Sequence, residues 1–168
     1  MGVTSVTKDA QALTMTLDAE FDASPERIWQ LWSDPRQLER WWGPPGYPAT
    51  VDSHDLRAGG RVEYHMTGPD GEMPRGYWDI IESDPPRHLL VRDGFANDDG
   101  SPNDDVPPGR FRLAIADIGG GRSRMTIESH FASADSMEQL LAMGQEQGMI
   151  EAVNQIDAIL AGEPVRAR

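Results

Sequence analysis

Seven short segments of alternating apolar and polar residues, followed by one long amphipathic stretch, constrain the fold of this chain more than any other feature. In the first segment, Leu13–Phe21, apolar side chains occupy every second position, which is typical of a strand with one buried face. Clusters of Gly, Pro and Asp separate the later segments and predict tight turns between antiparallel strands. The predicted strands span residues 13–21, 49–56, 61–67, 76–82, 88–93, 109–116 and 123–131.

Two short helices are predicted directly after the first strand. Ser24 precedes Pro25, so its hydroxyl can cap a helix that has proline at its first position. This helix is expected to end near Trp32. A second helix, capped by Asp34, is expected to end at Trp41-Trp42, because the run of Gly and Pro at residues 43–46 breaks helices.

The last element is predicted to be one long helix from Ser133 to Gly162, because its apolar residues recur mostly at spacings of three and four. About 28 helical residues would extend roughly 42 Å, enough to cross a whole sheet. Gly144 and Gly148 fall inside this helix, where each would cost about 1 kcal/mol relative to alanine. Close approach to a tryptophan or to the sheet would offset that cost, and so would space for a ligand.

These elements fit one α+β domain, in which a curved antiparallel sheet closes over the C-terminal helix. A length of 168 residues suits a single domain, and no low-complexity linker divides the chain. Residues 1–10 lack periodicity and are expected to form a flexible N-terminal tail. The domain is expected to span residues 11–162, with residues 163–168 as a C-terminal tail.

Charge and composition argue against several classes of function. A net charge of −13 would repel nucleic acid and anionic membrane surfaces. The chain has no cysteine, so disulfides and thiolate metal sites are excluded, and a cytoplasmic location fits that absence. No stretch of about 18 apolar residues occurs, so membrane insertion is not expected.

An acidic segment between Asp93 and Gly109 is predicted to be a mobile loop, because it is almost entirely Asp, Asn, Gly, Pro and Ser. Its acids lack the alternating ligand spacing and the distal glutamate of an EF-hand. We therefore expect neither a bound metal nor a cofactor.

The sequence favours an apolar pocket between the sheet and the long helix. Alternation places Val62, Tyr64 and Met66 on one face of their strand, and similar apolar sets on the other strands would face the helix. Aromatic and methionine side chains suit a ligand pocket, although they would equally fill a closed core. The candidate ligand-binding residues are Trp32, Trp41, Tyr64, Met66, Trp78, Phe111, Met125, Met143, Met149 and Val153.

A set of ordered motifs resembles one family. They are FDASPERIW at residues 21–29, WSDP at 32–35, WWGP at 41–44, LRAGGR at 56–61, MTGPDG at 66–71 and PPRHL at 85–89. The chain is thereby similar to the START-like (Bet v 1-like) SRPBCC superfamily, and within it to relatives of the C-terminal domain of the activator of Hsp90 ATPase. The resemblance implies a helix-grip fold, with seven strands around the last helix and two short helices closing one end. The family often has Gly-Trp in the last helix, where this chain has Gly148-Met149.

Three functions stay open at this point. The first is binding of a small apolar or amphipathic ligand. The second, implied by the resemblance, is regulation of an Hsp90-type chaperone, and the third is an enzyme acting on a hydrophobic ligand. Acid-base candidates for an enzyme are His54, His65, His130, Glu63 and Asp79, but alternation turns all of these except His54 outward. No catalytic residue is therefore assigned, and a homodimer is neither required nor excluded.

Overall fold

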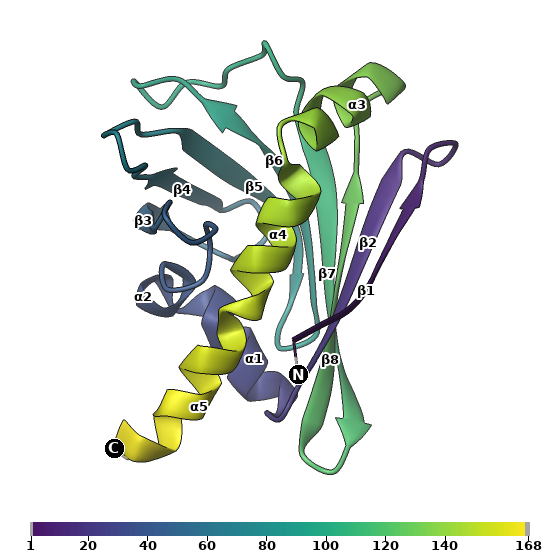
Figure 1. Cartoon of the computed structure of the whole chain (residues 1–168), viewed down its shortest axis with the longest axis vertical. Helices are drawn as coiled ribbons and strands as arrows, with labels where there is room; N and C mark the ends of the chain where they lie inside the picture. Colours follow the sequence, from purple (N-terminus) through teal and green to yellow (C-terminus); the bar gives the residue numbers. More distant parts are fainter. Residues whose placement is uncertain (1, 167–168) are drawn as a thin grey trace.

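An eight-stranded antiparallel sheet curves around the C-terminal helices (Figure 1). The computed structural model describes residues 2–166, without the side chains of residues 163–166. The strand order is β1-β2-β8-β7-β6-β5-β4-β3, and the helix-grip fold and the α+β class are confirmed. The strands are β1 Gly2–Asp9, β2 Thr14–Phe21, β3 Ala49–His54, β4 Arg61–Met66, β5 Arg75–Asp84, β6 His88–Ala96, β7 Gly109–Gly119 and β8 Arg122–His130.

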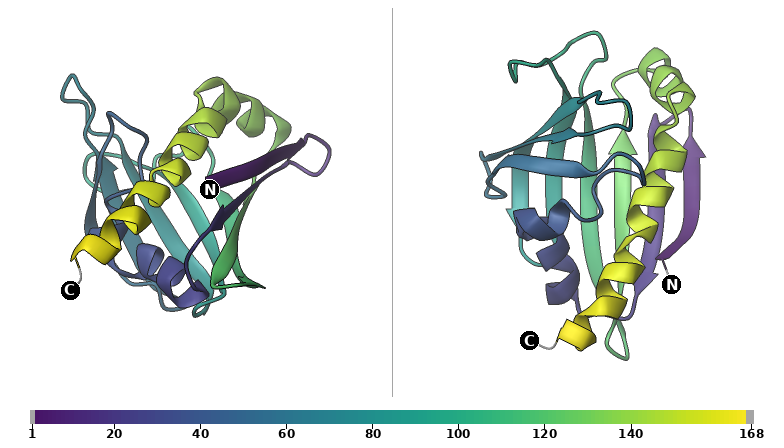
Figure 2. Two further views of the ribbon diagram at one scale, coloured as in Figure 1. Left: turned by 60° about the horizontal axis from the view of Figure 1, so that its bottom comes forward. Right: turned by 60° about the vertical axis from the view of Figure 1, so that its left-hand side comes forward.

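The helices lie in two groups. The short helices close one end of the sheet, and the C-terminal helices cross its concave face (Figure 2). They are α1 Pro25–Ser33, α2 Pro35–Leu38, α3 Ala134–Ala142, α4 Gln145–Asn154 and α5 Ile156–Arg166. Within residues 2–166, no helix combines the length and the apolar character needed to span a membrane.

Strand β1 corrects the prediction of a flexible N-terminal tail. Residues 2–9 pair with β2 along their whole length and add an eighth strand to the seven predicted. The pairing shifts register between Val3 and Ser5, so Val3 and Val6 both pack against the core although they are three residues apart. The bulge therefore hides the period of two that identifies a strand in the sequence.

The two short helices begin at the predicted caps. The Ser24 hydroxyl accepts a hydrogen bond from the Arg27 amide at 3.2 Å, and the Asp34 carboxylate accepts one from the Arg36 amide at 2.9 Å. Helix α2 ends at Leu38 and the chain continues as a turn, in which the Trp42 amide donates to the Leu38 carbonyl at 2.9 Å. This turn carries Trp41 and Trp42 into the interior.

The predicted single long helix is three consecutive helices. Gly144 has a φ of 90°, a left-handed conformation that interrupts the helix between α3 and α4. Gly144 is thus a helix break and not, as predicted, an interior helical residue. Helix α5 runs through Arg166, so part of the predicted C-terminal tail is helical, and residues 167–168 lie outside the described chain.

A cluster of tryptophans forms the centre of the main core. Trp32, Trp41 and Trp78 are fully buried, and Trp42 packs edge-on against Trp78 with ring centroids 4.9 Å apart. The Gln155 side-chain amide donates to the carbonyl of Trp41 at 3.2 Å, which ties the C-terminal helices to this cluster. The core therefore joins the short helices, the sheet and the junction between α4 and α5.

A second, smaller core lies under α3. Met15, Phe131 and Met137 form it, with Leu140 packed against its edge. It is separate from the cluster around Trp32. Helix α3 and helix α4 therefore rest on different apolar clusters.

We predict opposite effects of alanine at the two glycines of this region. Gly144→Ala should lower the free energy of unfolding by about 1 to 2 kcal/mol, because a Cβ is strained in the left-handed conformation even where nothing lies within 4 Å of it. Gly148→Ala should raise stability by up to about 1 kcal/mol, since it is helical and its Cβ would meet only Pro44 at 3.9 Å. Urea denaturation of both variants measures the difference, and equal effects would contradict the assigned break.

Candidate functional site

A pocket of about 220 Å³ lies between the concave face of the sheet and helix α4. Its inner wall is apolar, and the exposed Pro107 and Arg110 belong to its rim. The lining residues are Trp42, Gly43, Pro44, Tyr64, Met66, Asp93, Gly94, Phe95, Val106, Pro107, Gly109, Arg110, Phe111, Ile127, Ser129, His130, Phe131, Leu140, Gln145, Gly148, Met149 and Ala152.

The structure brings four of the ten predicted ligand-binding residues into the pocket wall, namely Tyr64, Met66, Phe111 and Met149. Five others lie in the core and are not among the lining residues: Trp32, Trp41, Trp78, Met125 and Val153 are all fully buried. Met143 is placed elsewhere, with 61% of its surface exposed, because the chain turns at Gly144 directly after it. The structure thus places a pocket between the sheet and α4, and six of the ten candidates lie outside its wall.

Trp42 lines the pocket although the sequence pointed to its neighbour Trp41. The indole nitrogens of Trp42 and Trp78 are both buried and complete no hydrogen bond. Their rings stand 5.9 and 6.2 Å from the ring of Tyr64. The sequence could not distinguish Trp41 from Trp42, because both follow α2 in a turn whose direction has no periodic signal.

Tyr64 reaches across the neighbouring strand. It pairs with Gly76 of β5, and a Cβ on Gly76 would overlap the Tyr64 hydroxyl. A glycine at this position therefore gives the phenol its room. Burial raises the pKa of Tyr64, so its hydroxyl stays protonated at neutral pH.

Asp93 is the functional candidate that the sequence reasoning missed. It stands opposite Trp78 of β5 and Gly109 of β7, and it lines the pocket. Asp93 is half-buried, and no side chain among residues 2–162 forms an ion pair or hydrogen bond with its carboxyl group. Burial raises the pKa of Asp93 to about 6, an effect that its own backbone amide partly offsets.

A signal for Asp93 was present in the sequence. Leu89 and Val91 are buried on the concave face, so the period of two carries Asp93 to the same face, followed by Phe95. The prediction ended the strand at Asp93 and assigned the acids from there onward to a solvated loop. The strand instead continues to Ala96, and the irregular segment begins after it.

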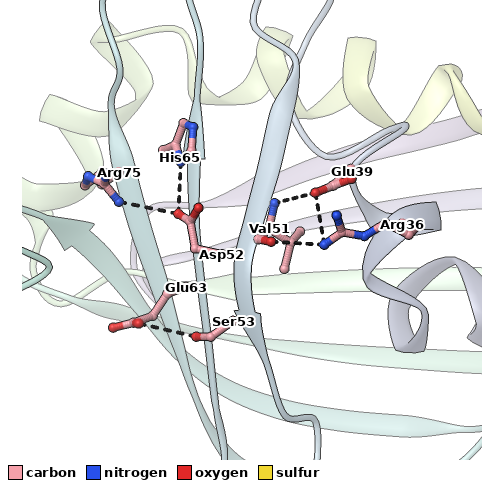
Figure 3. Close-up of polar contacts among 8 residues, drawn as sticks. All are labelled: Arg36, Glu39, Val51, Asp52, Ser53, Glu63, His65 and Arg75. Carbon is pink, nitrogen blue, oxygen red and sulfur yellow. Dashed lines mark hydrogen bonds and ion pairs between the residues drawn. The ribbon is translucent and has the colours of Figure 1, made fainter.

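The outer face of the sheet holds most of the acid-base candidates from the sequence. His65 Nδ1 lies 2.9 Å from the Asp52 carboxylate, which also contacts Arg75 at 3.4 Å (Figure 3). Glu63 accepts a hydrogen bond from Ser53 at 3.3 Å on the same face. These groups bond to one another away from the pocket, as the alternation predicted.

The remaining candidates also have partners within the chain. Asp79 pairs with Arg61 at 3.4 Å, and His130, at the pocket rim, lies 2.7 Å from Glu128. His54 Nε2 lies 3.0 Å from the Trp32 carbonyl oxygen. No group of three metal-ligating side chains occurs in the part of the chain that the structure describes.

Asp93→Asn should raise stability at alkaline pH and not at acid pH. A carboxyl group whose pKa is raised on folding destabilises the folded state increasingly as pH rises from about 4 to 6, and by a constant amount above that. We expect the variant to gain about 2 kcal/mol in unfolding free energy at pH 8 and to match the wild type near pH 4. Asp98→Asn, at an exposed position, is the control, and a gain that does not depend on pH would contradict the burial of Asp93.

Comparison with known proteins agrees with this architecture. A crystal structure from Mycobacterium smegmatis is 49% identical, covers 94% of this chain and 96% of its own, and has a TM-score of 0.87. A solution structure from Arthrobacter aurescens is 46% identical, with coverage of 95% and 92% and a TM-score of 0.91. The AHSA1 protein from Silicibacter pomeroyi, at 23% identity, coverage of 89% and 99% and a TM-score of 0.72, shows the shared fold.

No curated protein matches the chain in sequence. The model of one family, described as activator of Hsp90 ATPase homolog 1-like protein, matches residues 22–161. This match includes the two short helices, the Trp-bearing turn, the pocket strands and helix α4. The chain therefore belongs to the family of activator of Hsp90 ATPase homologue 1-like proteins.

Proposed function

We propose that the protein binds a small, largely apolar molecule in the pocket between the sheet and α4. The observation that carries this proposal is the pocket itself, a mostly apolar concavity with a few polar groups, which is the usual form of a small-molecule site. A space of about 220 Å³ suits a compact ligand, smaller than those of most drug-sized sites. Its wall combines apolar side chains with a few polar groups that would orient the ligand.

The wall residues have properties suited to this role. Met66 and Met149 are flexible and polarisable, so they adapt to the shape of a bound molecule. Tyr64 and Phe111 offer broad ring surfaces with little conformational entropy to lose. We assign direct ligand contact to these four residues and to Trp42. The five fully buried candidates, Trp32 among them, then pack beneath the wall residues and do not contact the ligand.

Catalysis is a second candidate, and Asp93 is the observation that favours it. A carboxyl group with a raised pKa inside an apolar pocket is a common feature of acid-base sites. The titratable groups that line the pocket beside it are Tyr64, Arg110 and His130, and His130 already pairs with Glu128. His130 is the second group that could accept a proton, but its side chain is 37% exposed at the rim, so binding is better supported than a reaction.

The chaperone alternative rests on the family's name. That name refers to similarity to a homologue of an activator of the Hsp90 ATPase, and in this chain the matched region accounts for one domain with a pocket. Binding of a ligand requires a pocket, whereas contact with the surface of a chaperone does not. The pocket therefore favours ligand binding over chaperone regulation.

A larger side chain at position 149 should close the pocket. Met149→Trp adds an indole to the wall, so we expect binding of 4-phenylbutan-1-ol to weaken at least tenfold. Met149→Leu nearly conserves the side-chain volume, so its affinity should stay within about twofold of the wild type. Isothermal titration calorimetry measures the affinities, and circular dichroism checks the fold of each variant. Equal affinity of the Trp variant and the wild type would place the ligand outside this pocket.

A further inference from the structure

Asp93 is an acceptor without a side-chain partner in a mostly apolar pocket. Its carboxyl group faces the cavity from the middle of the sheet, between Trp78 and Gly109 on the adjacent strands. Removing a carboxylate from water costs several kcal/mol unless an opposite charge or hydrogen-bond donors compensate it. Asp93 is half-buried and no described side chain provides that compensation, so it comes from solvent in the free protein and can come from a ligand in a complex.

A second acceptor also lines the pocket without a partner. The Gln145 side-chain oxygen, in the first turn of α4, is buried and accepts no hydrogen bond. Two unpaired acceptors call for a ligand that donates several hydrogen bonds. A protonated amine has three N–H donors and no acceptor, so it satisfies acceptors without adding an unpaired lone pair of its own.

Aromatic rings surround the same space. Trp42, Tyr64, Phe95 and Phe111 all line the pocket with Asp93. The face of an aromatic ring attracts a cation, most strongly where water is excluded. A carboxylate surrounded by aromatic side chains therefore suits a ligand that has an ammonium group and an apolar tail.

The unpartnered indole N–H groups lie at the side of the pocket that Tyr64 occupies. The rings of Trp42 and Trp78 contact the Tyr64 ring, and neither indole N–H completes a hydrogen bond. An ammonium group cannot accept from these donors, so we assign it to the Asp93 side of the pocket and not to this one.

The net charge of the chain also favours a cation, although one arginine lines the pocket. On the rim, Arg110 is exposed and makes no ion pair with Asp93, and His130 pairs with Glu128. Tyr64 is neutral in the working pH range, and Trp78, opposite Asp93, has no charge. The whole chain has a net charge of −13, which raises the local concentration of cations and lowers that of anions.

We infer that the pocket selects a small apolar amine, which binds as its ammonium ion to the carboxylate of Asp93 within the aromatic wall formed by Trp42, Tyr64, Phe95 and Phe111. This inference rests on the proposed function and adds the chemical class of the ligand to it. Hydrogen bonds from the ammonium group go to Asp93 and to the Gln145 oxygen. The apolar tail occupies the space beside Met66 and Met149.

The ion pair makes binding depend on pH in a defined direction. Asp93 must be ionised and the amine protonated, so affinity increases as pH rises through about 6, the pKa of Asp93 in the free protein. Binding of the cation then lowers this pKa, and near pH 6 complex formation releases about half a proton to the buffer. A neutral ligand of the same shape releases none.

Three probes of one shape and different charge test the inference by isothermal titration calorimetry. They are 4-phenylbutan-1-amine, 4-phenylbutan-1-ol and 4-phenylbutanoic acid, each titrated into the wild type, Asp93→Asn and the exposed control Asp98→Asn at pH 5.0, 6.0 and 7.5. At pH 7.5 the amine should bind the wild type and the Asp98 variant at least tenfold more tightly than the alcohol. In the Asp93 variant this preference should disappear.

The outcomes separate this inference from the proposed function. If the alcohol or the acid binds the wild type as tightly as the amine, the amine inference is overturned and an apolar pocket is retained. If none of the three probes binds, both the amine inference and the proposed function are overturned. Titration of the wild type at pH 6.0 in two buffers of different ionisation enthalpy measures the proton release without any variant, so a folding defect in Asp93→Asn would not obscure the answer.

Discussion

The packing of tryptophan against tryptophan at the closed end of the sheet is the interaction on which the rest of the structure depends. Trp32 contacts the rings of Trp41, Trp42 and Trp78, and its indole N–H donates to the sulfur of Met125 at 3.4 Å on β8. These rings fill the core next to the short helices. Trp42 belongs both to this cluster and to the pocket wall, so the pocket begins where the tryptophan packing ends.

The same cluster determines how the pocket is shaped. Gln155 fixes the junction of α4 and α5 by donating to the carbonyl of Gly43 at 2.8 Å as well as to that of Trp41. Helix α4 is thereby held at a set distance from the sheet. The pocket is the space between α4 and the curved sheet. Asp93 lies in it because β6 continues past the buried Val91, so that Asp93, two residues later, points to the same concave face.

Much of this architecture could be predicted from the sequence, because alternation, caps and turn residues are local signals. The buried set of β2 and the caps at Ser24 and Asp34 were read correctly for that reason. β1 was missed because its bulge disrupts the period of two, and the break at Gly144 because the apolar spacing continues on both sides of it. Which tryptophan faces the pocket depends on packing between distant segments, and no local pattern encodes that.

Two apolar clusters of different size support the walls of the pocket. Leu140 of α3 borders the pocket and rests on the small cluster of Met15, Phe131 and Met137, whereas α4 rests on the large core. Local opening free energies follow the amount of apolar surface that an element buries. The cluster under α3 has only three buried residues, so amide hydrogens of α3 are expected to exchange with solvent before those of α4. Local opening of α3 would move Leu140 away from the edge of the pocket and leave the tryptophan core packed.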